Sequence, residues 1–154
     1  METDTAIAAI EASVGTESGP TDWFTVDQAR INMFADATED HQWIHVDTER
    51  AAAGPFGGTV AHGFLTLSLV PYLAGQLRRG GDNTGVKMGI NYGLDRVRFP
   101  APVPAGARVR ARSTLISCDR VGDAALQLVN RVTIEVEGSE KPACVADTVS
   151  RLYF

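Results

Sequence analysis

The sequence predicts an α+β domain in which a curved antiparallel sheet wraps round a long central helix. Helical patterns fill the first half of the chain, and the pattern at residues 64–77 is apolar on nearly every side, which is typical of a buried helix. From Val86 onward, polar and apolar residues alternate as they do in half-buried strands. Because a buried helix needs other elements to cover it, the later strands are predicted to form a sheet around it.

The first twenty residues precede the main pattern. At 154 residues the chain has the length of one domain. Apolar residues at helical spacing predict a short amphipathic helix over residues 3–14. The run GTESGP then ends this pattern, because Gly and Pro favour turns. We therefore treat residues 1–20 as an N-terminal extension and residues 21–154 as the domain.

A second helix is predicted to begin near Thr25. Thr25 is a good N-cap residue, and Gln28 follows three positions later, which is a capping-box pattern. The apolar stripe fades near Thr38. The next run, DATEDHQWIHVD (Asp36–Asp47), is therefore predicted to lie in a loop at the C-terminal end of this helix.

Residues 47–53 predict another short helix, with Asp47 or Thr48 as its cap. The following ten residues, 54–63, contain four Gly and one Pro. This composition predicts a loop whose backbone takes unusual angles or lies close to another group. In the apolar helix after it, Pro71 removes one amide donor, which predicts a kink or a split.

Strand patterns occupy residues 86–99, 107–121, 124–137 and 142–154. The alternation in the second predicts that one face carries Val109, Ala111, Ser113 and Leu115, and the other Arg108, Arg110 and Arg112. In the third, one face carries Leu126, Leu128, Asn130, Val132, Ile134 and Val136. A Pro-rich connection, residues 100–106, separates the first two strands.

Composition narrows the classes of function. The net charge is −5 and no basic run occurs, which argues against a nucleic-acid partner. Cys118 and Cys144 lie outside any CxxC motif, so we expect two reduced thiols in a cytoplasmic protein. The N-terminus lacks a signal-peptide pattern. The longest apolar run, residues 64–73, is too short to span a bilayer, so no membrane partner is expected.

Three segments together resemble a known family. The runs FADATEDHQWIHVD, FGGTVAHGFLTLSL and NYGLDRVRFPAPV are similar, in order and spacing, to the MaoC-like, hydratase-2 type of enoyl-CoA hydratases. The run DHQWIH resembles the subgroup of nodulation-protein-N-like dehydratases, and the resemblance covers residues 23–154. It implies a single hot-dog fold and an (R)-specific enoyl-CoA hydratase, or 3-hydroxyacyl-thioester dehydratase, in fatty acid metabolism. It implies neither a cofactor nor a metal.

The resemblance assigns roles to individual residues. Asp40 matches the catalytic aspartate of the family, and His45 matches the catalytic histidine. Gly63 matches the glycine whose backbone N–H is expected to form the oxyanion hole. Gln42 stands where the family has Asn, so it keeps an amide on a longer side chain and is a candidate to orient the pair. Trp43 replaces a proline, and no role carries over to it.

Addition of water to a 2-enoyl thioester needs groups of these kinds. A base must take a proton from water, an acid must protonate the α-carbon, and a donor must stabilise the charge on the thioester oxygen. Asp and His can share the proton transfers once their environments tune them. A glycine amide offers a fixed donor without a Cβ in the way. We therefore expect one water molecule between Asp40 and His45, with Gly63 N–H on the carbonyl; which of the two takes the first proton stays open.

Without the resemblance, these residues have ordinary explanations. Asp40 and His45 would be a helix-end acid and a polar loop residue. His41 and His45 lie four apart between Asp40 and Asp47, which invites a metal site, but the pattern is not HExxH and offers no third ligand set. His41 is expected at the surface, and His62 is expected to be a partly buried, hydrogen-bonded imidazole.

The expected partner is an acyl thioester of CoA or of acyl carrier protein. Five basic residues lie nearest the motifs and are candidates to meet its phosphates: Arg78, Arg79, Lys87, Arg96 and Arg98. The acyl chain needs an apolar tunnel, which we expect along residues 34–37, residues 51–56 and the central helix.

The resemblance also implies a homodimer with one continuous sheet, because an open sheet edge is normally paired. Two other functions stay open. One is a hot-dog acyl-CoA thioesterase, which would release free thiol. The other is a non-catalytic acyl-thioester-binding subunit, which would bind without turnover.

Overall fold

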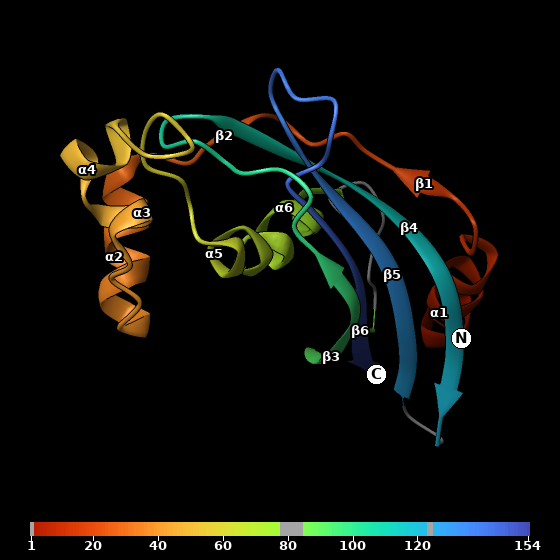
Figure 1. The fold of residues 1–154 in the computed structure, drawn as a ribbon. Helices are drawn as coiled ribbons and strands as arrows, with labels where there is room; N and C mark the ends of the chain where they lie inside the picture. Colours follow the sequence, from red (N-terminus) through yellow and green to blue (C-terminus); the bar gives the residue numbers. More distant parts are fainter. Residues whose placement is uncertain (1, 78–84, 123–124) are drawn as a thin grey trace.

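The computed structural model describes residues 2–77, 85–122 and 125–154. A six-stranded antiparallel sheet curves round the helices that lie on its concave side (Figure 1). The strands are β1 (Glu17–Ser18), β2 (Phe24–Thr25), β3 (Met88–Arg98), β4 (Arg108–Val121), β5 (Ala125–Val136) and β6 (Cys144–Tyr153). Their order is β1-β4-β5-β6-β3, and β2 also pairs with β4. The predicted α+β class with a curved antiparallel sheet is confirmed.

The helices are α1 (Glu2–Ala12), α2 (Gln28–Thr38), α3 (Trp43–Val46), α4 (Thr48–Ala52), α5 (Gly63–Ser68) and α6 (Val70–Leu77). The central helix is thus two segments, α5 and α6, that meet at Leu69. Pro71 has no N–H to donate to the preceding turn, which explains the break. The predicted split is therefore confirmed. No helix in the described part of the chain is both long and apolar enough to cross a membrane.

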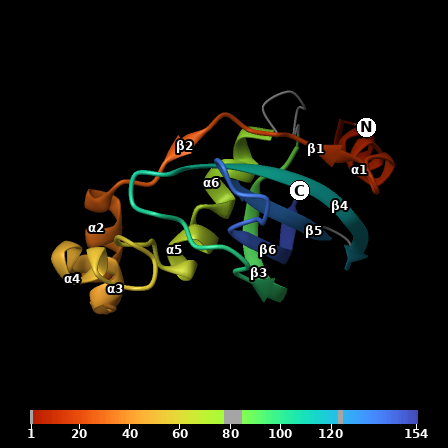
Figure 2. The same ribbon diagram turned by 45° about the horizontal axis from the view of Figure 1, so that its top comes forward.

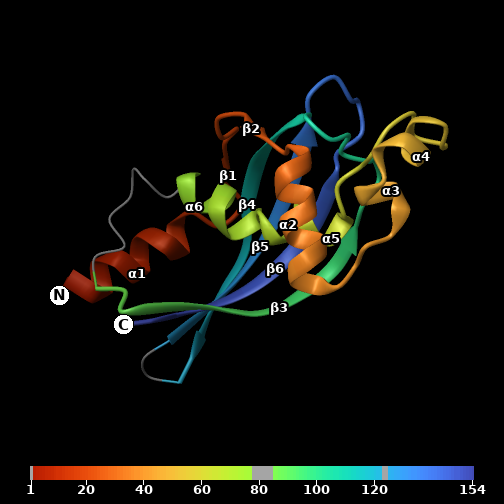
Figure 3. The ribbon, with the colours of Figure 1, turned by 90° about the vertical axis from the view of Figure 1, so that its left-hand side faces the viewer.

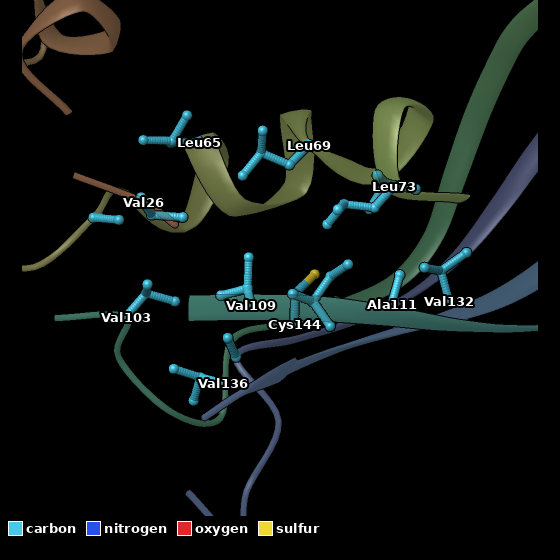
Figure 4. Close-up of a cluster of buried hydrophobic side chains, with 14 of the residues drawn as sticks. Val26, Leu65, Leu69, Leu73, Val103, Val109, Ala111, Val132, Val136 and Cys144 are labelled. Atoms are coloured by element: carbon cyan, nitrogen blue, oxygen red, sulfur yellow. The ribbon is translucent and has the colours of Figure 1, made fainter. Parts of the chain in front are cut away.

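The main core lies between the central helix and the concave face of the sheet. Leu65 of α5, Leu69 between the two helices and Leu73 of α6 are buried in this core, and Figure 4 shows Leu73 pointing toward the strands. The facing side of the core is formed by residues of β4, β5 and β6, namely Val109, Ala111, Val132, Ile134, Val136, Cys144 and Ala146. The faces predicted for β4 and β5 are confirmed, because their inward apolar residues are buried and alternate with more exposed ones.

The N-terminal segment packs on the same concave face. Ile7 of α1 joins a second cluster with Leu115, Leu126, Leu128 and Leu152. The helix α1 lies beyond α6 along the sheet (Figure 3). The strand β1 follows it in the chain and pairs with β4. The helix predicted over residues 3–14 is therefore present as α1, and the division of the chain at residue 20 stays a prediction.

The predicted start of α2 is wrong. Thr25 is not the N-cap but a residue of β2, where it pairs with Arg108 of β4. Asp27 caps the helix instead, since its side chain accepts a hydrogen bond of 2.9 Å from the N–H of Arg30. Pairing with β4 keeps the chain extended through Thr25, so the helix begins only at Gln28. The C-terminal end at Thr38 agrees with the prediction.

The run Asp36–Asp47 is not wholly a loop, because α3 forms within it. The short helix predicted after it is confirmed as α4, with Asp47 as its N-cap. Figure 2 shows α2, α3 and α4 gathered beside the start of α5, away from the curved part of the sheet. These elements position the candidate site.

One edge of the molecule remains apolar and open. Within the described chain, β3 pairs with β6 alone and is exposed along nearly its whole length. The central helix is also not buried on every side as expected, because Phe64 and Tyr72 are exposed. A single curved sheet covers only one side of this helix.

Candidate active site

The end of α2, the helix α3 and the start of α5 meet at Asp40. Glu39 ends α2 in the left-handed conformation, with φ 59°, and so turns the chain away from the helix axis. The carbonyl oxygen of Asp40 then accepts a hydrogen bond of 2.9 Å from Nε2 of His62. The carboxylate of Asp40 remains exposed to solvent.

His45 lies on α3 and is only 7% exposed. Its Nδ1 is 2.6 Å from the carbonyl oxygen of Val60. A carbonyl oxygen can only accept, so Nδ1 must carry the hydrogen. In the neutral ring Nε2 is then left with a free lone pair, as a proton acceptor requires.

The environment of His45 also favours its neutral form. Burial lowers the pKa of His45 below its ordinary value of 6.5. The bond to Val60 and the charge of Asp40 oppose this lowering, and the neighbouring His62 adds to it. The ring is therefore available to accept a proton near neutral pH.

Asp40 and His45 lie at a spacing that suits one shared water molecule. A carboxylate oxygen of Asp40 and a ring nitrogen of His45 lie within 4.8 Å of each other. Two groups that each hydrogen-bond the same water at about 2.8 Å are separated by roughly twice that distance or less. The geometry therefore allows both side chains to hold one water between them.

Gly63 is the first residue of α5, directly after His62. The N–H groups of a first helical turn have no intrahelical acceptor, and Gly63 N–H donates to no described residue. A Cβ at this position would lie 2.9 Å from Cδ2 of Phe99. A side chain is thus excluded here by Phe99, which packs against the backbone that carries the free donor.

The structure separates the metal cluster suggested by the sequence. His41 is exposed and pairs with Asp36 at 2.8 Å, which agrees with its expected surface position. Asp47 caps α4 by accepting from the N–H of Arg50. Neither residue joins Asp40 and His45.

A different trio lies together: Asp40, His45 and His62 offer ligand atoms within 4.8 Å of one another. The rings of His45 and His62 are stacked, with centroids 3.8 Å apart and planes inclined by 24°. The lone pair of an imidazole nitrogen lies in the ring plane, so two nearly parallel rings direct theirs side by side. This arrangement does not suit a tetrahedral ion such as zinc.

Two residues support the site through contacts that the sequence did not predict. His62 is almost completely buried, rather than partly buried as expected. Gln28, assigned there to helix capping, donates from Nε2 to the carbonyl oxygen of His45 at 2.8 Å. Its amide oxygen accepts from the hydroxyl of Thr59. Gln28 thus ties α2 to α3 and to the Gly-rich loop, across sequence separations that no local pattern reveals.

Gln42 and Trp43 differ in what they contact. The side chain of Gln42 is exposed and makes no hydrogen bond to any described residue, so its orienting role stays a prediction. Its carbonyl accepts from the N–H of His45 at 2.9 Å. Trp43 packs under Arg50, whose guanidinium carbon is 4.4 Å from the ring centroid. A Cβ on Gly54 would lie 3.0 Å from the same ring, so Trp43 holds α3 against α4 and the loop that follows.

The basic residues predicted to meet phosphates remain predictions. Arg78 and Arg79 lie outside the described residues. Arg98, the last residue of β3, is exposed. Arg96 lies on β3, and Lys87 directly precedes that strand.

A cavity of about 880 Å³ lies between the central helix, the N-terminal segment and the sheet. Its walls include Leu67, Ala74 and Gly75 of the central helix, Ile10 of α1 and Leu128 of β5. Residues 34–37 and 51–56, which were expected to line an acyl tunnel, do not contribute to it. Of the segments expected to line the acyl tunnel, only the central helix lines this cavity, and the course of the tunnel stays a prediction.

Comparison with known proteins places the chain among dehydratases. The family model described as MaoC like domain matches residues 9–137. The chain is 54% identical over 151 residues to 3-hydroxyacyl-thioester dehydratase Z of Mycobacterium tuberculosis, and the match covers 98% of each chain. It is 46% identical to Nodulation protein N of Rhizobium leguminosarum bv. viciae, covering 97% of this chain and 92% of that protein.

The fold agrees with these relatives. The structure superimposes on an (R)-hydratase from A. caviae involved in PHA biosynthesis with a TM-score of 0.68 and 26% identity. The match covers 89% of this chain and 94% of that one. The predicted hot-dog fold is therefore confirmed.

Proposed function

Because the chain belongs to the MaoC-like domain family, we propose that it is an (R)-specific enoyl-thioester hydratase. In the reverse direction it is a 3-hydroxyacyl-thioester dehydratase. The observation that carries the proposal is the spacing of Asp40 and His45, whose polar atoms lie within 4.8 Å of each other and of His62, the residue directly before Gly63. The (R) configuration rests on the (R)-hydratase to which the fold is similar.

The first step is proton transfer from a water molecule held between Asp40 and His45. His45 is the better placed base, since its Nδ1–H is bonded to Val60 and its Nε2 is free. The water oxygen bonds to the β-carbon as His45 takes its proton, and the double-bond electrons shift toward the thioester oxygen. The Asp40–His45 pair then returns one proton to the α-carbon, which completes the addition of water.

Gly63 N–H stabilises the charge that develops on the thioester oxygen. This donor is fixed by the helix and needs no rearrangement as the charge forms. The loss of one such donor typically lowers the rate by about 10²–10³-fold. Phe99 packs against Gly63 on the side where a Cβ would lie, so a side chain at this position would disturb the backbone that carries the donor.

The acyl chain extends from Gly63 along the central helix into the cavity. Leu67 and Ser68, which line the near end of the cavity, stand one turn or slightly more beyond Gly63. At about 1.5 Å per residue, this is roughly 6–8 Å along the helix axis. The thioester at Gly63 can thus stay in place while the far carbons of a medium-length or longer chain fill the cavity. Ile10 of α1 closes the other side of this space.

The proposed enzyme is a cytoplasmic homodimer. Its open edge strand β3, with exposed Met88, Ile90, Tyr92 and Leu94, supports pairing with a second copy. Both cysteines are free thiols, which supports a reducing compartment.

Substitution of the pair tests the proposal. In a spectrophotometric assay of crotonyl-CoA hydration, Asp40→Ala and His45→Ala should each lower kcat by about 10²–10⁴-fold, because each removes a proton-transfer group. His41→Ala is the matched control. His41 lies on the same segment but pairs with Asp36 at the surface, so its loss should leave kcat within about twofold. Folded Asp40 and His45 variants with near-normal hydration would exclude the proposed roles.

The alternatives give different readouts with the same protein. A thioesterase would release free thiol from a saturated acyl-CoA, which a thiol-reactive dye detects. A non-catalytic subunit would bind an enoyl-CoA, seen by calorimetry, without hydrating it at any chain length.

A further inference from the structure

His62 is the least exposed titratable side chain near the site, at 2% exposure. It directly precedes Gly63 at the start of α5. It contacts both Asp40 and His45, although the proposed chemistry gives it no proton to carry. Its contacts therefore need a separate explanation.

The first contact holds the backbone of Asp40. Nε2 of His62 donates to the main-chain oxygen of Asp40 at 2.9 Å. Asp40 follows the left-handed residue Glu39 and lies at the surface, where few other contacts restrain it. Its carboxylate is joined in the described structure only by a long bond of 3.4 Å from Gln42 N–H. The bond from His62 is thus the main restraint on where Asp40 lies.

The second contact supports the ring of His45. The imidazole of His62 stacks on His45 with centroids 3.8 Å apart. The ring of Phe34 packs against His62 at 4.9 Å. The hydrogen bond to Val60 restrains one edge of the His45 ring, and stacking on His62 restrains the face of the same ring.

Packing alone does not explain an imidazole at this position. Nδ1 of His62 is buried and has no hydrogen-bond partner among the described residues. An unpaired buried polar atom is destabilising, and a phenyl ring would fill similar space without it. The imidazole is favoured only if the donor on its other nitrogen is needed.

We propose that His62 is a positioning residue that sets the separation between Asp40 and His45. It does so by donating to the Asp40 backbone and by stacking on the His45 ring. The roles of Asp40 and His45 rest on the function proposed above. His62 itself does not touch the reacting atoms.

Two variants separate the contacts. His62→Gln keeps an amide donor near the position of Nε2 but loses the ring. His62→Phe keeps a ring over His45 but loses the donor. His62→Ala loses both. Leu126→Ala is the matched control for lost stability, since Leu126 is as buried but belongs to the second cluster with α1.

The expected result is a loss in kcat with little change in KM. His62→Ala should lower kcat for enoyl-CoA hydration by about 10²-fold, as a misplacement of about 1 Å can. His62→Gln and His62→Phe should each have a kcat about tenfold higher than that of His62→Ala. KM should stay within about threefold of the unsubstituted enzyme in all three variants. Leu126→Ala should lower the melting temperature and leave kcat within about threefold. A His62→Ala enzyme with near-normal kcat, or a Leu126→Ala enzyme equally impaired, would overturn the proposal.

A second readout does not depend on activity. The chain has three histidines, so the ring signals of His45 can be assigned by NMR with His41→Ala and His62→Phe variants. His62→Ala should shift the His45 ring signals, because the stacked ring is gone, and His62→Gln should shift them similarly. If the unsubstituted protein hydrates no enoyl-CoA, the proposed function fails. If the His45 signals do not move, the inference about His62 fails.

Discussion

At the scale of the residue, one main-chain carbonyl decides what His45 can do. The carbonyl oxygen of Val60 accepts from Nδ1 of His45 at 2.6 Å, and so leaves Nε2 as the acceptor. The N–H of Val60 in turn donates to the carbonyl oxygen of Ile44 at 3.0 Å. The hydrogen bonds between α3 and the Gly-rich loop thus hold the carbonyl of Val60 where it sets the tautomer of the proposed base.

The pH dependence of hydration tests this assignment. Burial lowers the pKa of His45 below 6.5, so the ring stays neutral down to that pH. Protonation removes the free lone pair, so kcat/KM should be constant near neutral pH and fall toward acid, with a midpoint below 6.5.

His41→Ala serves as the control, because Asp36 raises the pKa of His41 at the surface. This variant should leave the profile unchanged. An acid limb with its midpoint above 6.5 would contradict the assignment.

At the scale of the element, the division of the central helix separates two tasks. The segment α5 begins with Gly63 at the site, while α6 carries Ala74 and Gly75 along the cavity. A Cβ added to Gly75 would meet no atom within 4 Å. This glycine leaves open the space that a side chain would occupy.

Filling that space should change the preferred acyl chain. Gly75→Leu should lower kcat/KM for long enoyl-CoA substrates by at least about tenfold and leave crotonyl-CoA hydration nearly unchanged. The reason is that the leucine occupies the cavity without reaching Gly63. The measurement is kcat/KM across a series of chain lengths.

Gly75→Ala is the matched control. It should raise the free energy of unfolding by about 0.5–1 kcal/mol, because alanine is the better helix residue, and keep the chain-length profile. Equal losses for short and long substrates in Gly75→Leu would show that the acyl chain lies elsewhere.

At the scale of the whole molecule, the exposed edge strand β3 predicts the assembly. Leu94 of β3 is 47% exposed, and Ile116 of β4, on another strand, is 43% exposed. Only Leu94 lies on the edge that a second copy would extend, since β4 already has neighbours on both sides.

Light scattering at micromolar concentration should therefore find a dimer for the natural chain and a monomer for Leu94→Glu. The substitution would place two like charges near each other across the dimer. Ile116→Glu, matched in exposure and in charge, should remain dimeric. A natural chain that is monomeric under these conditions, or dimeric only with a different partner chain, would contradict the homodimer.

Much of the fold was predictable because its signals are local. Alternation along β4 and β5 identified their inward faces, and Pro71 predicted the break between α5 and α6. The start of α2 was not predictable in the same way. Thr25 has the side chain of a cap, but pairing with Arg108 more than eighty residues later in the sequence holds it in a strand.

The sequence by itself determined the class of fold, the order of the elements and the residues that resemble a catalytic pair, Asp40 and His45. These depend on residue types and on periodicities within a few positions. Only the tertiary structure decided which atoms of those residues are free. Three hydrogen bonds do so. Val60 contacts His45 across 15 positions, Gln28 contacts His45 across 17, and His62 contacts Asp40 across 22. Such contacts leave no period in the chain, because they arise only where packing on the sheet brings α2, α3 and α5 together.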